Sequence, residues 1–166
     1  MIFISTGGFY TKSAYETALD FIDSGIYNIE LSGGIYCPDQ KDLLQKLSRK
    51  ANLVPHNYFP PPKESFVLNL ASDNDDIYKK SRDHIINSAI LSAELGSKFY
   101  SFHSGFLCDP KPSQLGKPIR ALPMSDRKIA LSKFIERINP ISDYCENLGI
   151  NLLIENNVLS YRNYQN

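Results

Sequence analysis

The sequence predicts an α/β fold whose strands are parallel. Short apolar segments with a strand-like pattern alternate regularly with segments whose apolar residues recur at helical spacing, and glycines follow several of them. Such alternation is typical of parallel strands joined by right-handed crossovers. The chain has 166 residues, 42% of them hydrophobic, and neither a domain linker nor a low-complexity segment is evident. One domain over residues 1–166 is therefore expected.

Capping residues and glycines mark the bounds of the first predicted strands and helices. Residues 2–6 are a short apolar strand closed by a glycine pair. Residues 13–16 read Ser-x-x-Glu, a capping box, so a helix is predicted from there to Gly25, a residue typical of helix C-termini. Residues 27–31 are predicted as the second strand, and residues 39–50, with leucines on one face, as the second helix.

The middle of the chain contains the strands that carry the histidines. Residues 52–59 are the third strand, stopped by three prolines. Residues 66–71 are apolar enough for a strand or for a tucked-in extended segment, and residues 75–95 are a long helix. Aromatic and polar residues alternate through residues 98–106, the fourth strand. Residues 104–125 hold four prolines, and so long a loop in a compact α/β unit is usually functional.

The last predicted elements are a helix and a fifth strand. Residues 126–148 form the helix, with Pro140 expected to kink it, and residues 150–155 form the strand. Residues 159–166 show no clear element. A closed barrel takes eight strands and about 250 residues. Five strands therefore fit either an open sheet or the front portion of a barrel, and unpaired outer strands predict self-association or dependence on further chain.

Composition narrows the classes of function. The formal net charge is zero, which argues against nucleic acid and anionic membranes as partners. Three cysteines at wide spacing (Cys37, Cys108 and Cys145) are typical of a reducing compartment rather than a disulfide framework. We found no signal-peptide pattern and no apolar run near the roughly 20 residues that span a membrane. A cytoplasmic protein is the simplest expectation.

Three predicted strands end on side chains that bind metals. His56 lies in the third strand, His103 ends the fourth, and Glu155 ends the fifth. The carboxyl ends of parallel strands share one edge, where ligands gather in α/β folds. Two imidazoles and a carboxylate with open coordination positions suit zinc, manganese or iron better than calcium. We therefore predict a divalent-metal site, with Lewis-acid chemistry or a bound hydroxide as its use.

Each candidate also has a structural interpretation. A histidine in an apolar strand such as that of His56 is more often a hydrogen-bonded core residue than a ligand. Glu155 follows a run of strand residues, where a carboxylate is expected to be paired, protonated or bound. Glu30, also at a strand end, is either a surface residue or a hydrogen-bonding partner for a sugar hydroxyl. Lys117 and Arg120 in the long loop are either solvated or bind a phosphate.

Several segments in order resemble a known superfamily. The order and spacing of five segments resemble those of the xylose-isomerase-like TIM barrels. The segments are HNYFPPP, FVLNLAS, the helix containing KSRD, FHSG and LLIENN. This superfamily contains sugar phosphate isomerases and epimerases and the endonuclease IV family. The resemblance implies a (β/α) TIM-barrel type fold of which about five of eight βα units are present, because the counterparts of strands six to eight are missing.

The resemblance also implies roles for the candidate residues. His56 matches the third-strand histidine, His103 the histidine of a His-Pro-Gly-like motif in which Ser104 replaces proline, and Glu155 the metal-binding glutamate, which in epimerases also handles a substrate proton. It implies a metal-dependent sugar or sugar-phosphate isomerase or epimerase with zinc or manganese. Two alternatives stay open: an endonuclease IV-like enzyme that cuts DNA at abasic sites, and a truncated, non-catalytic remnant.

Overall fold

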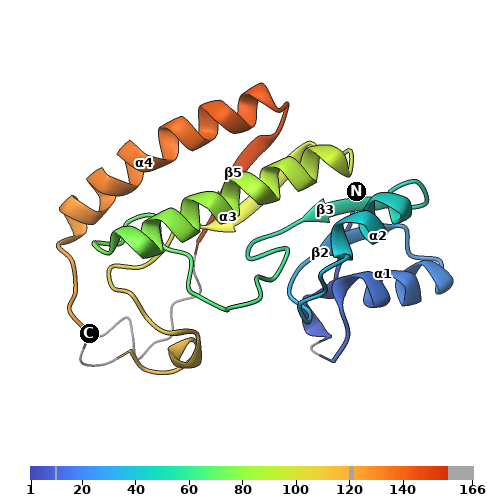
Figure 1. The fold of residues 1–166 in the computed structure, drawn as a ribbon, viewed down its shortest axis with the longest axis horizontal. Helices are drawn as coiled ribbons and strands as arrows, with labels where there is room; N and C mark the ends of the chain where they lie inside the picture. Colours follow the sequence, from blue (N-terminus) through green and yellow to red (C-terminus); the bar gives the residue numbers. More distant parts are fainter. Residues whose placement is uncertain (10, 120–121, 157–166) are drawn as a thin grey trace.

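The computed structural model describes residues 1–9, 11–119 and 122–156 (Figure 1). Strands and helices alternate along the chain. The elements are, in chain order, β1 (Ile4–Ser5), η1 (Thr6–Gly8), α1 (Ala14–Asp23), β2 (Asn28–Leu31), α2 (Gln40–Leu47), β3 (Asn52–Pro55), α3 (Asp75–Glu94), β4 (Phe99–His103), η2 (Pro112–Gln114), α4 (Arg127–Asn147) and β5 (Asn151–Glu155). The predicted α/β class is confirmed.

The strands lie side by side in chain order and run parallel. β1 pairs with β2 and β2 with β3, while β4 pairs with β5 in a separate ladder. A parallel bridge between His56 and Ser101 joins the two ladders, and the Asn57 amide donates to the Ser101 carbonyl at 2.6 Å. The strand order 1-2-3-4-5 is that of a barrel-type segment. In a doubly wound sheet the first strand would lie inside the sheet.

One face of this segment is covered by helices. Tyr100 and Phe102 of β4 are fully buried and pack with residues of α3 and α4, and Ile29 and Leu31 of β2 pack with residues of α1 and α2. Side chains alternate along a strand, so the residues between these point to the other face. That face carries Glu30, Ser101 and His103 among its partly exposed side chains. The fold therefore separates a buried apolar side, covered by the helices, from a more exposed side that bears the candidate site.

The helix termini follow the capping residues in the sequence. Ser13 accepts from the Glu16 amide at 3.2 Å, and the Glu16 carboxylate accepts from the Ser13 amide at 2.8 Å, which is the predicted capping box. Asn74 caps α3 and Asp126 caps α4. No helix within the described ranges is long and apolar enough to cross a membrane.

Residues 66–71 contain no strand, so the extended alternative of the prediction holds. Leu68, Asn69, Leu70 and Ala71 are buried. The Asn69 amide donates to the Ser81 hydroxyl of α3 at 2.9 Å instead of to a strand. Hydrogen bonds to side chains therefore satisfy this buried backbone, as buried polar groups require.

Candidate metal centre

Three predicted ligands converge at the carboxyl edge of the sheet. His56 directly follows β3, and His103 and Glu155 are the last residues of β4 and β5, where they are register partners. The bridge between His56 and Ser101 places β3 beside β4 at this level. Adjacent parallel strands are about 4.8 Å apart. Strand pairing alone therefore brings the three residues into reach of one another.

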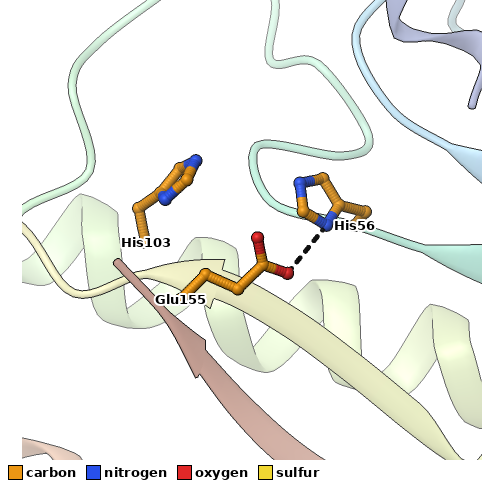
Figure 2. Close-up of side chains that lie close together, drawn as sticks. All are labelled: His56, His103 and Glu155. Atoms are coloured by element: carbon orange, nitrogen blue, oxygen red, sulfur yellow. Dashed lines mark ion pairs between the residues drawn. The ribbon is translucent and has the colours of Figure 1, made fainter. Parts of the chain in front are cut away.

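Each of the three side chains offers one ligand atom, and these atoms lie within 4.8 Å of one another. The His56 Nδ1 atom is 3.2 Å from Glu155 Oε1, and the two imidazole ring centroids are 6.2 Å apart with an interplanar angle of 86°. Figure 2 shows the Glu155 carboxylate between the two rings. Zinc requires bonds of about 2.0–2.2 Å, so the three side chains would draw closer together around a bound ion.

The residues present fit a divalent metal. His103 Nδ1 is buried and, among the residues that the structure describes, has no hydrogen-bond partner. Buried imidazole nitrogens are normally satisfied, so this atom needs an explanation. A ring that coordinates a metal provides one. The donor set, two imidazoles and one carboxylate with side chains neither fully buried nor fully exposed, is that of catalytic zinc and manganese sites.

Two further oxygens surround His56. The Ser101 hydroxyl oxygen is 2.8 Å from His56 Nδ1, and Glu30 Oε2 is 3.9 Å from the same atom. The sequence predicts Glu30 as a site residue, whereas Ser101 is not among the predicted residues. The signal was available, because Ser101 lies two positions before His103 in an alternating strand and so faces the same side.

Two basic residues, Lys117 and Arg120, are also predicted to take part in the site, and the structure describes one of them. Lys117 is exposed in the long loop, where it donates to the Ser113 carbonyl at 2.9 Å. Arg120 lies outside the described residues. His84 of α3 is not part of the group of candidate ligands and is packed against the rings of Tyr58 and Phe66.

A polar cluster fixes the loop that leaves β4. The Asn69 side chain, buried to 1% exposure, donates to the Cys108 carbonyl at 3.1 Å and to Asp109 Oδ1 at 2.9 Å. Its oxygen accepts from the Phe106 amide at 3.2 Å. A Cβ atom at Gly105 (φ +123°) would stand 2.5 Å from that oxygen, so only glycine fits. This contact begins two residues after His103.

Exchanging the donor and the acceptor between Asn69 and Asp109 tests this polar cluster. Asn69→Asp is expected to lower the free energy of unfolding by about 3 kcal/mol or more, because a buried carboxylate would face the Asp109 carboxylate and a carbonyl oxygen. Adding Asp109→Asn returns an N–H donor between the two side chains and should recover part of the loss. Urea unfolding of both variants measures this. A double variant no more stable than Asn69→Asp would contradict the proposed pairing.

The comparisons with known proteins show the family and the fold of this chain. The profile of the family described as "Xylose isomerase-like TIM barrel" matches residues 23–158. The chain belongs to this family. The match covers β2 to β5 and all three candidate ligands. Membership in the xylose isomerase-like TIM barrel family confirms the predicted barrel-type fold.

Solved structures of the same fold include sugar epimerases. A D-tagatose 3-epimerase-like protein has a TM-score of 0.64 at 19% identity, covering 92% of this chain and 54% of that one. D-psicose 3-epimerase from Clostridium cellulolyticum H10, solved with D-tagatose, has a TM-score of 0.61 at 14% identity, covering 93% and 50%. No curated protein matches the sequence significantly.

A protein from Thermus thermophilus, TTHB071, whose crystals were soaked with ZnCl2, is a further similar structure. Its TM-score is 0.57 at 22% identity, with coverage of 85% of this chain and 51% of that chain. The present xylose isomerase-like chain thus spans about half the length of the structures that it matches. At these identities the likeness shows the fold alone.

Proposed function

We propose that the protein is a metal-dependent isomerase or epimerase of a sugar or sugar phosphate. The observation that carries the proposal is the convergence of His56, His103 and Glu155, whose ligand atoms lie within 4.8 Å at the carboxyl edge of the strands. Active sites of (β/α) barrels are built at this edge. Reactions that move a proton beside a carbonyl need a base and a group that stabilises the oxygen. Glu155 is the candidate base, and a metal held by the three residues would stabilise the oxygen.

The three ligands hold a divalent metal, zinc or manganese, which when bound supplies Lewis-acid polarisation of a substrate oxygen. Glu155 is the candidate acid/base, because its side chain is 41% exposed and so accessible to a substrate. Its Oε1 atom lies 3.2 Å from His56 Nδ1, and in this proposal these two atoms would bind the same metal, while the second oxygen of Glu155 accepts the proton. The His56 contact also orients the carboxylate.

Substrate binding is assigned to residues beside the metal ligands. Glu30, with a side-chain exposure of 32%, accepts a hydrogen bond from a sugar hydroxyl in this proposal. Lys117 and Arg120 of the long loop bind the phosphate of a phosphorylated substrate. The solved epimerase structures with this fold support a sugar as substrate, and the zero net charge supports a small molecule rather than DNA.

Proton exchange with solvent tests the proposed reaction for many sugars at once. The protein, loaded with zinc or manganese, is incubated in D2O with a panel of ketoses and ketose phosphates, and NMR follows deuterium incorporation beside the carbonyl. Exchange is expected for at least one sugar, and Glu155→Gln should abolish it. Glu146→Gln, which removes an exposed carboxylate on α4, is the matched control and should leave it unchanged.

Two outcomes would contradict the proposal. Cleavage of an oligonucleotide at an abasic site, with no exchange on any sugar, would favour the endonuclease alternative. Absence of both activities in protein that has bound metal would favour a non-catalytic chain.

A further inference from the structure

Asn57, the residue after His56, has a left-handed backbone conformation. Its φ is +30°, and within the described ranges it is the one residue other than glycine with a positive φ. This conformation is unfavourable for most side chains, and asparagine tolerates it better than most. Strained backbone of this kind persists only where the surrounding structure holds it, and it clusters at functional sites. The contacts of Asn57 therefore bear on the geometry of the metal centre.

Asn57 bonds in two places to β4, the strand that carries His103. Its backbone amide donates to the Ser101 carbonyl at 2.6 Å, and its side-chain Oδ1 atom accepts from the His103 amide at a long 3.5 Å. In a regular parallel ladder a residue makes both bonds through its own backbone, so the His103 amide would donate to the Asn57 carbonyl. Because the backbone of Asn57 is left-handed, its side-chain oxygen takes the place of that carbonyl.

We propose that Asn57 is a positioning residue that fixes the separation of His56 and His103, so that both imidazoles reach one metal ion. It follows one ligand in the chain and holds the backbone of the other. The position requires tolerance of a positive φ and an acceptor oxygen, and asparagine provides both. Glycine provides only the first. The inference rests on the metal centre of the proposed function and is independent of the sugar reaction.

Zinc titration of substituted proteins tests this role. Asn57→Gly keeps the backbone conformation and removes the acceptor oxygen, and it should weaken zinc binding by about 10-fold. Asn57→Asp keeps an acceptor oxygen and should bind zinc at least as tightly as the parent. Asn52→Ala is the matched control, because it removes an exposed side-chain hydrogen bond to Asn28 (2.8 Å) at the other end of β3. Its zinc affinity should equal that of the parent.

Two further measurements separate positioning from a loss of stability. Urea unfolding identifies conditions under which every variant is fully folded, and the titrations are made there. Amide exchange then reads the hydrogen bond in metal-free, 15N-histidine-labelled protein. The chain has three histidines, and His103→Gln identifies the His103 signal. The His103 amide should exchange slowly in the parent and in Asn57→Asp, and faster in Asn57→Gly by up to about tenfold.

The outcomes separate this role from the proposed function. Folded Asn57→Gly that binds zinc like the parent overturns the positioning role, even if the protein acts on a sugar. Equal exchange of the His103 amide in the parent and Asn57→Gly also overturns it. If Asn57→Gly does not fold, fast exchange of this amide in the parent overturns the role, and slow exchange retained in Asn57→Asp supports it. Weaker zinc binding by Asn57→Gly, without proton exchange on any sugar, supports the role and overturns the proposed reaction.

Discussion

Glu155→Gln is expected to weaken zinc binding by more than about 100-fold, since even the removal of a group behind a ligand costs 10–100-fold. The substitution keeps the size of the side chain and removes the anionic ligand. It also replaces the carboxylate that lies 3.2 Å from His56 Nδ1. His103→Ala, which removes an imidazole from the same cluster, is expected to reduce the affinity at least as much. Calorimetric titration of each variant with zinc measures both effects.

Glu146→Gln is the matched control for charge. It removes one carboxylate from the exposed surface of α4, outside the cluster of His56, His103 and Glu155. Its zinc affinity should equal that of the parent. If Glu155→Gln and His103→Ala also bind zinc like the parent, the three side chains do not form the metal centre.

Acidification is expected to destabilise the protein through His84. This residue is buried on α3 against Tyr58 and Phe66, and its Nε2 atom has no hydrogen-bond partner among the described residues. Burial lowers the pKa of His84 from 6.5 to about 4. Between these values the unfolded chain binds a proton that the folded chain does not. Stability is therefore lost as the pH falls from about 6.5 to about 4, by about 3 kcal/mol in total.

His84→Leu removes this titration. The free energy of unfolding, measured by urea denaturation between about pH 7 and pH 4, should fall by about 3 kcal/mol more in the parent than in the variant. Asp83→Asn is the control, because Asp83 is an exposed partner of Arg82 on the same helix and such pairs contribute little. If the free energy of unfolding falls equally with pH in the parent and in His84→Leu, His84 titrates alike in the folded and unfolded states.

The strand ends explain why the candidate ligands could be found from the sequence. Alternation through residues 98–106 fixes which face His103 occupies, and the strand–helix repeat fixes that all carboxyl ends share one edge. The parallel register then places Glu155 opposite His103. Local pattern and topology together therefore determine this part of the site.

Other parts depend on contacts that local pattern does not encode. The hydrogen bonds between Asn69 and Asp109 join segments 40 residues apart, and residues 66–71 have strand-like composition but bond to a serine of α3. Ser101 is visible in the strand pattern, but its contact with His56 requires the position of β3 beside β4. Tertiary contacts of this kind override or extend what propensity predicts.

The proposed function depends on one divalent metal bound by His56, His103 and Glu155. Anomalous diffraction from crystals soaked with zinc, recorded at the zinc absorption edge, locates the metal without reference to activity. We expect one strong anomalous peak between the three side chains, with bonds of about 2.0–2.2 Å to an imidazole nitrogen of each histidine and to an oxygen of Glu155. Peaks only at other residues, or no peak at this position at millimolar zinc, would show that these side chains are not the metal ligands.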